Sequence, residues 1–227
     1  MNFLKQVQGR LVVSCQALPE EPLHSAFIMG RMARAAKERG ASAIRAQGVE
    51  DIREIRRVTG LPVIGLIKRS YEDSPVYITA TLREVEELLD SGCDMIAIDM
   101  TARPRPAGAD VSALIKRVHE AGVLVLADIS TYEEGLEAAR IGADAISTTM
   151  SGYTPYSPQL AGPDLELVKR LAADAPVPVF AEGRINTPEE LCKAMAAGAY
   201  APIIGSAITR PQLITAKFFK ALGGEGK

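Results

Sequence analysis

The sequence VPVFAEGRIN (residues 177–186) joins an apolar run directly to a polar segment. The short run Val177–Ala181 is typical of a strand that is buried on both faces. Glu182, Gly183 and Arg184 follow at once, where such a strand would end. Strands of this kind belong to parallel sheets that are covered by helices. The stretch therefore predicts an α/β protein with polar side chains at a strand end.

Runs of this kind recur from one end of the chain to the other, and the residues between them have helical spacing, as in Leu167, Val168 and Leu171. The eight expected strands are Leu11–Cys15, Ala43–Ala46, Val63–Ile67, Met95–Ile98, Val123–Ala127, Ala145–Thr148, Val177–Ala181 and Ala201–Ile204. Buried strands that alternate with helices in this number predict a closed (β/α)8 TIM barrel, which typically takes roughly 250 residues. We expect residues 1–227 to form one barrel domain.

A repeated phrase precedes alternate strands and supports this assignment. Its four copies are Gly40-Ala41-Ser42-Ala43, Gly92-Cys93-Asp94-Met95, Gly142-Ala143-Asp144-Ala145 and Gly198-Ala199-Tyr200-Ala201. Each glycine suits the position after a helix where φ is positive, and a strand begins directly afterwards. The phrase reflects either an internal repeat of two βα units or simply the way such loops are built. Both interpretations give the same strand positions.

Composition and charge restrict the possible functions. The 227 residues carry a net charge of −2 and no strongly basic stretch, so we expect no nucleic-acid surface. Three widely spaced cysteines, Cys15, Cys93 and Cys192, favour a reducing compartment over a disulfide framework. No cluster has the spacing of metal ligands, and no apolar run is long enough to cross a membrane. These features predict a cytoplasmic protein without a bound metal.

Polar residues stand at the carboxyl ends of most expected strands. In a (β/α)8 barrel the chemistry takes place at this face, and alternate strands supply the same layer of side chains. The first, third, fifth and seventh strands would supply Gln16, Lys68, Asp128 and Glu182, and Arg45 ends the second strand. Each has a structural alternative: Lys68 could begin a solvated loop, Asp128 could cap a helix, and Glu182 could pair with Arg184. Arg45 could equally belong to the scaffold.

The loops after the last two strands predict a phosphate site. Such barrels bind phosphate between these loops and a following helix N-terminus. Glycine lets backbone N–H groups approach the phosphate, a hydroxyl can donate to it, and arginine supplies charge. The residues in these positions are Gly183, Arg184, Gly205, Ser206 and Arg210. We therefore expect a small phosphomonoester substrate that is held by its phosphate.

Several motifs together resemble one known family. They are VSCQALPEEPL, IRAQGVEDI, PVIGLIKRSYEDSPVYIT, ADISTYEEG, STTMSGYT, AEGRINTPEE and GSAITRPQLIT. The chain is similar over Gly9–Phe218 to the N-acetylmannosamine-6-phosphate 2-epimerases of bacterial sialic-acid and amino-sugar catabolism. These are phosphate-binding barrels that need no metal or organic cofactor. The resemblance implies interconversion of N-acetylmannosamine 6-phosphate and N-acetylglucosamine 6-phosphate.

The resemblance also implies roles for the residues at the strand ends. It makes Lys68 and Glu182 catalytic and places Gln16, Arg45 and Asp128 along the sugar. The chemistry is consistent with these roles, because C2 beside the C1 aldehyde loses its proton to give an enolate, which needs an acid/base group and oxyanion donors. Two alternatives remain open: a Schiff-base sugar-phosphate aldolase on the same barrel, and a non-catalytic barrel that binds phosphosugars.

Two features near the C-terminus leave alternatives open. Pro202 departs from the aliphatic run of the family, and because proline lacks an N–H we expect it among the first residues of the last strand. The helix expected over Thr209–Leu222 is unusually apolar, with Leu213, Phe218 and Phe219 among its residues. It either packs on the first and last strands or forms a subunit contact, by exchange of the helix between two copies. A homodimer is the favoured assembly.

Overall fold

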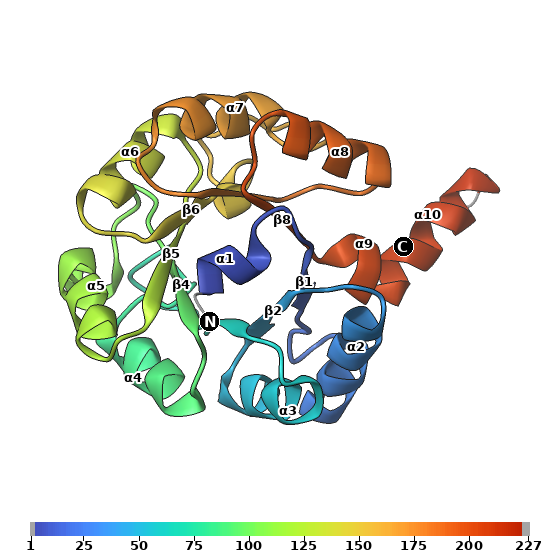
Figure 1. The fold of residues 1–227 in the computed structure, drawn as a ribbon, viewed down its shortest axis with the longest axis horizontal. Helices are drawn as coiled ribbons and strands as arrows, with labels where there is room; N and C mark the ends of the chain where they lie inside the picture. The colour runs from blue at the N-terminus through green and yellow to red at the C-terminus, as the bar shows by residue number, and fades with distance from the viewer. Residues whose placement is uncertain (1–2, 224–227) are drawn as a thin grey trace.

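The computed structural model of the protein describes residues 3–223. Eight parallel strands close into a barrel in the order in which they occur along the chain (Figure 1). They are β1 (Val12–Cys15), β2 (Ala43–Gln47), β3 (Val63–Leu66), β4 (Met95–Asp99), β5 (Leu124–Asp128), β6 (Ala145–Ser147), β7 (Val179–Glu182) and β8 (Ala201–Ile204). The expected (β/α)8 architecture is confirmed.

Helices follow every strand and form a ring around the barrel (Figure 1). The ring is formed by α2 (Ala26–Glu38), α3 (Val49–Thr59), α4 (Leu82–Ser91), α5 (Val111–Glu120), α6 (Tyr132–Arg140), α7 (Leu165–Asp174), α8 (Pro188–Ala196) and α9 (Ser206–Thr209). A further helix, α10 (Pro211–Ala221), follows α9. Two short 3₁₀ turns, η1 (Pro106–Gly108) and η2 (Thr148–Met150), lie in the loops after β4 and β6.

Proline sets the start of two strands. β7 begins at Val179, two residues later than expected from the sequence, and the carbonyl of Pro178 before it accepts a hydrogen bond from Ile146 N–H. Pro202 is the second residue of β8 and pairs with Ala181 of β7. The expected place of Pro202 at the start of the last strand is therefore confirmed.

The two-residue alternation of each strand divides the core into two layers. On β1, Val12 points into the barrel and Val13 points outward against the helices. On β3, Ile64 faces inward and Val63 faces outward in the same way. Side chains on a strand alternate between its two faces, so each inward apolar residue is followed two positions later by another inward residue. This alternation carries polar side chains into the carboxyl end of the barrel.

Helix ends agree with the repeated glycine phrase. Gly40, Gly92, Gly142 and Gly198 all have positive φ, between 75° and 111°, as expected for this position. At the other end of the helices, Thr131 caps α6 by accepting a hydrogen bond from Glu134 N–H. Asp128 is therefore not the cap of this helix, and the capping alternative for it does not hold.

Both ends of the described chain differ from the structure predicted from the sequence. The sequence patterns did not predict α1 (Phe3–Val7), which lies over the centre of the barrel in Figure 1 and buries Phe3 and Val7 in the inner core. The helix expected over 209–222 is interrupted, because Pro211 has no N–H and begins a new helix.

The packing expected for this last helix is correct only for its first part. The Thr209 hydroxyl at the end of α9 donates to Ser14 O on β1. By contrast, α10 has no buried residue and projects away from the ring of helices (Figure 1). The interpretation that α10 packs on the first and last strands is therefore wrong.

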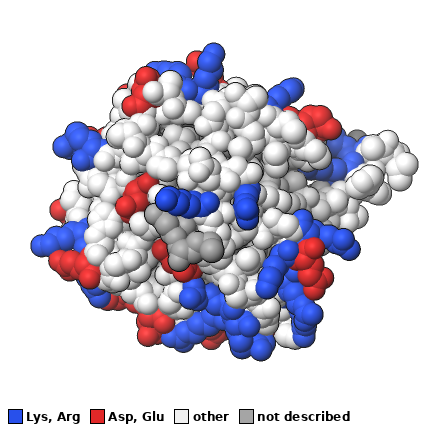
Figure 2. All heavy atoms as spheres, in the orientation of Figure 1, with Lys and Arg blue, Asp and Glu red and all other residues white. Residues whose placement is uncertain are grey.

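Charged side chains of both signs surround the face shown in Figure 2. Lysine and arginine gather along its lower edge, over α2 and α3. On α3 each arginine pairs with a carboxylate: Arg53 with Asp90, Arg56 with Asp94 and Arg57 with Glu54. These arginines are therefore neutralised locally. No helix among the described residues is long and apolar enough to span a membrane.

Candidate active site

A cavity of about 790 Å³ opens at the carboxyl end of the barrel, a size typical of small-molecule sites. All but one of the residues predicted from the sequence line it. They are Gln16, Arg45, Lys68, Glu182, Gly183, Arg184, Gly205, Ser206 and Arg210. The exception is Asp128, which is fully buried and does not line the cavity.

Arg45 organises the floor of the cavity. Its Nη1 and Nη2 donate to Asp128 Oδ1 and Oδ2 at 2.9 and 2.6 Å, which is a bidentate pair. Nη1 also donates to Glu182 Oε2 at 2.7 Å. The Arg45 side chain is only 1% exposed. Removal of either carboxylate would therefore leave the buried positive charge of Arg45 with one partner fewer. Asp128 therefore acts from beneath the cavity by holding Arg45.

Thr149 joins the two carboxylates and was not among the residues predicted for the site. Its hydroxyl lies 2.7 Å from Asp128 Oδ1 and 2.8 Å from Glu182 Oε2. The hydroxyl of Ser147, two residues earlier, lies 2.8 Å from the hydroxyl of Thr149. The strand period marks Ser147, which is the second inward position of β6, whereas Thr149 lies in η2, where this period no longer applies.

Burial makes Glu182 a weaker acid than an ordinary glutamate. Burial raises the pKa of Glu182 above that of an ordinary glutamate; Arg45 opposes this shift and Asp128 adds to it. Because Glu182 pairs with Arg45 and not with Arg184, the salt bridge considered from the sequence is not formed. Asp128 holds both nitrogens of the Arg45 fork, so Glu182 is the carboxyl group that is better placed to carry a proton.

Lys68 lies two residues beyond Leu66, the last inward residue of β3, and lines the same cavity. Burial, with Arg45 and Arg210 nearby, lowers the pKa of Lys68 to about 8, although Glu182 and Asp128 oppose the shift. A lysine in this environment is partly unprotonated near neutral pH and can act as a base. Its neighbour Arg69 also lines the cavity, but its guanidinium pairs with Glu84 and Glu87.

The amide of Gln16 is a further polar group at the cavity wall. Its nitrogen donates to Ser14 Oγ at 2.8 Å, while its oxygen is buried and has no partner among the described residues. A buried acceptor without a donor is unfavourable in an empty cavity. A ligand hydroxyl or N–H at this point would satisfy it.

Arg184 is held at the other end of the cavity by neutral groups. It donates to Ser151 O at 2.6 Å and to Gly162 O at 2.8 Å, and it has a positive φ of 55°. Gly152 makes room for it, because a Cβ there would lie 1.6 Å from Arg184 Nη1. Both acceptors are carbonyls, so within the described residues the charge of Arg184 has no carboxylate partner.

The other elements of the expected phosphate cradle lie on the same wall. Gly183 has a φ of 103°, and Gly205 and Ser206 begin the turn into α9. Arg210 differs from Arg184, because its guanidinium donates to Glu21 Oε2 at 3.0 Å. Arg184 is thus the cation with more charge available for an anion.

Tyr77 and Tyr153 also line the cavity and were missed from the sequence. Tyr77 lies on the loop after β3 and Tyr153 on the loop after β6, far from any strand end. Loop residues of this kind carry no periodic signal. Among residues 3–223, no group of three or more His, Cys, Asp or Glu side chains is placed to hold a metal ion.

Fold and cavity together define an enzyme of the (β/α)8-barrel class. The family model described as "Putative N-acetylmannosamine-6-phosphate epimerase" matches residues 29–224 of the chain. A relative from Clostridioides difficile (strain 630), named "Putative N-acetylmannosamine-6-phosphate 2-epimerase", is 61% identical over 97% of this chain and 99% of its own length. The chain belongs to the N-acetylmannosamine-6-phosphate epimerase family.

Solved structures agree with this assignment. The N-acetylmannosamine-6-phosphate 2-epimerase from Clostridium perfringens superposes with a TM-score of 0.96 at 57% identity, over 97% of this chain and 96% of its own. The thiamine phosphate pyrophosphorylase from Pyrococcus furiosus superposes with a TM-score of 0.61 at 18% identity, over 98% of this chain and all of its own. The second likeness shows the shared barrel fold alone.

Proposed function

We propose that the protein interconverts N-acetylmannosamine 6-phosphate and N-acetylglucosamine 6-phosphate by removing the proton on C2 and returning it to the opposite face. The observation that carries this proposal is the pair formed by Lys68 and Glu182 in one cavity. The pKa of Lys68 is lowered to about 8 and that of Glu182 is raised. Burial that lowers the pKa of a lysine or raises that of a glutamate brings each group closer to the pH at which the enzyme works, which is typical of catalytic acids and bases. Family membership favours the epimerase over the aldolase and over a non-catalytic barrel.

Each group has a role in the proposed reaction. Unprotonated Lys68 takes the proton from C2 of the open-chain sugar, and the charge that develops moves to O1. Protonated Glu182 gives its proton to O1, and Arg45 stabilises the negative charge that remains on the carboxylate. Asp128 and Thr149 keep Arg45 and Glu182 in place. Lys68, which now carries the proton, returns one to the other face of C2 after the enediol has turned, and Glu182 takes back the proton of O1. The inversion is then complete and both groups are restored.

The phosphate is proposed to lie at the wall formed by Gly183, Arg184, Gly205 and Ser206. The unpaired charge of Arg184 supports this position, and Arg210 lies nearby with its charge shared by Glu21. The phosphate then acts as a handle that fixes C2 near Lys68. The unsatisfied oxygen of Gln16 would accept a hydrogen bond from the sugar or from its N-acyl group.

We further propose that the protein is a homodimer whose contact includes α10, through exchange of this helix between the two copies. The support is its exposed apolar surface: Phe218 is 73% exposed and Phe219 52%. A helix that buries none of its own side chains gains little from the barrel that carries it. A second copy would cover the same surface on both subunits at once.

Proton exchange at C2 tests the reaction directly. The protein is incubated with N-acetylmannosamine 6-phosphate in deuterated water, and C2 is followed by NMR. The proposed mechanism predicts deuterium at C2 of the product N-acetylglucosamine 6-phosphate. Product that keeps all of the original hydrogen at C2 would contradict transfer through the amine of Lys68, whose hydrogens exchange with the solvent. Trapping by borohydride distinguishes the aldolase, because only a Schiff base would be reduced to a stable adduct.

A further inference from the structure

Lys68 is held by a short antiparallel ladder that lies beyond the end of β3. Lys68 pairs with Ile78 on the returning part of the loop after β3. On one side Thr79 N–H donates to Ile67 O at 2.8 Å, and on the other Arg69 N–H donates to Tyr77 O at 2.9 Å. The backbone of Lys68 is therefore fixed by segment 77–79 and not by a barrel strand.

This returning segment has an unfavourable backbone at Thr79. Its φ is 47°, which is rare for a β-branched residue and persists only where neighbouring groups hold it. The Thr79 hydroxyl also accepts a hydrogen bond from Ile67 N–H at 3.3 Å. Thr79 thus makes two contacts to the residue before Lys68, in a conformation that needs support from elsewhere.

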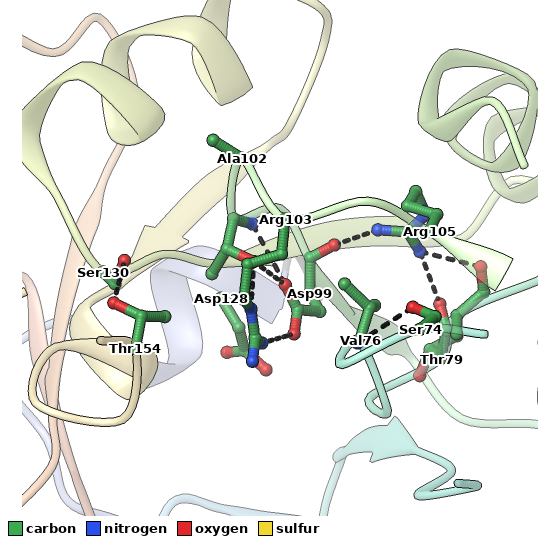
Figure 3. Close-up of polar contacts among 12 residues, drawn as sticks. Ser74, Val76, Thr79, Asp99, Ala102, Arg103, Arg105, Asp128, Ser130 and Thr154 are labelled. Atoms are coloured by element: carbon green, nitrogen blue, oxygen red, sulfur yellow. Dashed lines mark hydrogen bonds and ion pairs between the residues drawn. The ribbon is translucent and has the colours of Figure 1, made fainter. Parts of the chain in front are cut away.

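Arg105, on the loop after β4, provides that support. Its Nη2 donates to Thr79 O at 3.1 Å and to Ala80 O at 3.0 Å, and its Nη1 donates to Asp99 O at the end of β4. Figure 3 shows the guanidinium between Asp99 and Thr79. All three acceptors are backbone carbonyls, so the guanidinium ties the returning segment to the end of a barrel strand.

Arg103 on the same loop is a natural comparison. It donates to the Asp99 carboxylate at 2.6 Å and to the Thr101 hydroxyl at 2.9 Å (Figure 3). Neither contact reaches segment 77–79. The two arginines therefore share Asp99, while Arg105 also holds the ladder that carries Lys68.

We propose that Arg105 is a positioning residue for Lys68, which acts through Thr79 and the antiparallel ladder to hold the lysine amine inside the cavity. The inference rests on the proposed function only in that Lys68 carries the proton of C2. The positioning itself concerns the place of one amine and can be measured without turnover.

The surroundings of Lys68 determine the direction in which its pKa should change in an Arg105 variant. Arg45 from β2 and Arg210 from the turn after α9 face it, and so do Asp128 from β5 and Glu182 from β7. Burial is the largest cause of its low pKa of about 8. An amine that moves toward solvent regains hydration, so its pKa rises toward the ordinary value of about 10.4. Less of it is then unprotonated at neutral pH.

The test is a titration of Lys68 by NMR in protein that carries ¹³C-labelled lysine. The Lys68 signal is assigned by its loss in Lys68→Met. In the parent protein we expect a midpoint near 8. In Arg105→Met we expect a clearly higher midpoint, together with a kcat at pH 7 that is lower by about 10- to 100-fold and a nearly unchanged KM, as for small misplacement of a catalytic group.

Two further variants keep the result interpretable. Arg105→Lys keeps a cation but cannot reach all three carbonyls at once, so its midpoint and kcat should be intermediate. Arg103→Met perturbs the same loop and the same aspartate, and its Lys68 midpoint should match that of the parent. A merely structural loss of stability would lower the melting temperature of these variants without moving the titration of Lys68.

The outcomes separate this inference from the proposed function. If Lys68 titrates at the parent value in both Arg105 variants, or if Arg103→Met shifts it equally, the positioning role of Arg105 is overturned. If Lys68→Met itself retains turnover, the catalytic role of Lys68 fails instead. The titration of the Arg105 variants would still decide whether Arg105 places the amine.

Discussion

Thr149 shows how one hydroxyl can distinguish two carboxyl groups. It lies within hydrogen-bond distance of Asp128 and of Glu182, yet a hydroxyl has a single hydrogen to donate. If Thr149 donates to Asp128, its oxygen can accept from a protonated Glu182. This arrangement agrees with the raised pKa of Glu182. The direction of one hydrogen bond therefore links the protonation of the acid to the anchoring of Arg45.

Replacement of Lys68 by alanine tests the proposed base at the residue scale. Lys68→Ala should bind the substrate nearly normally and lose most of its turnover, because a general acid–base group typically contributes about 10²- to 10⁴-fold. Lys68→Arg should not restore activity, since a guanidinium does not release its proton near neutral pH. Steady-state kinetics and substrate binding by calorimetry would measure both. Activity above a tenth of the parent value in Lys68→Ala would assign the base to another residue.

Glu182 and Arg184, the two charged residues of AEGRIN, should affect different kinetic parameters. Glu182→Gln keeps the size of the side chain but removes its titratable proton, so kcat should fall while KM changes little. Arg184→Ala removes a charge-assisted contact to phosphate worth roughly 1.5–3 kcal/mol, which should appear mainly as a raised KM. Arg184→Ala should also reduce the preference for phosphorylated over free N-acetylmannosamine.

Both variants are compared on both sugars. The assignment fails if Glu182→Gln raises KM alone, or if Arg184→Ala leaves the preference for the phosphorylated sugar intact. Gly152→Ala is a second but less selective perturbation of Arg184, because the new Cβ would occupy the place of its guanidinium and would also strain the backbone at a φ of 80°. It should reproduce the KM effect of Arg184→Ala.

At the scale of elements, the buried Glu134 in the first turn of α6 holds the loops around the cavity. Glu134 on α6 accepts from Ala102 N–H after β4, from Ser130 after β5 and from Tyr156 after β6. Glu190 occupies the corresponding position on α8, but within residues 3–223 it accepts only from Asn186 N–H in its own loop. The same helix position thus serves three loops in one case and a single loop in the other.

This difference predicts unequal costs for the same substitution. Glu134→Ala should lower the free energy of unfolding by about 2–3 kcal/mol, because it leaves the buried N–H and hydroxyl of Ser130 without their acceptor. Glu190→Ala should cost about 1 kcal/mol or less, as is usual for the loss of one exposed contact at a helix start. Urea unfolding would measure both, with an unchanged m-value as the sign that the folded state is intact. Equal losses would show that Glu134 does not hold the loops.

What the sequence could predict at this scale follows from the strand period. Arg45, Lys68, Asp128 and Glu182 could be located because inward positions recur every two residues and end at the mouth of the barrel. Arg105 could not, because its partners are backbone carbonyls on another loop, and no residue pattern marks them. Thr79 likewise carries no sign in the sequence of its left-handed backbone.

At the scale of the whole molecule, closure of the barrel was predictable and the arrangement of the chain ends was not. Eight apolar runs in regular alternation with helices left few other architectures. By contrast, α1 covers only five residues, and its burial depends on the shape of the barrel end. The outward course of α10 depends on Pro211 and on what covers its apolar residues.

The proposed dimer predicts that a charge on α10 will separate the subunits. Phe218→Glu should convert a dimer to a monomer in sedimentation at micromolar concentration, because it places a carboxylate in the apolar contact. Lys220→Glu on the same helix serves as the control and should remain dimeric. A parent protein that sediments as a monomer would contradict the proposal, as would a dimer that persists in Phe218→Glu.

Helix α1 packs over the amino end of the barrel, and the cavity opens at the carboxyl end. Both sugar phosphates are proposed to use the same Lys68, the same Glu182 and the same wall for the phosphate. Each sugar thus excludes the other while it is bound. Each should therefore inhibit conversion of the other in a strictly competitive manner. Net flux would then reverse whenever the ratio of the two concentrations crosses the equilibrium constant.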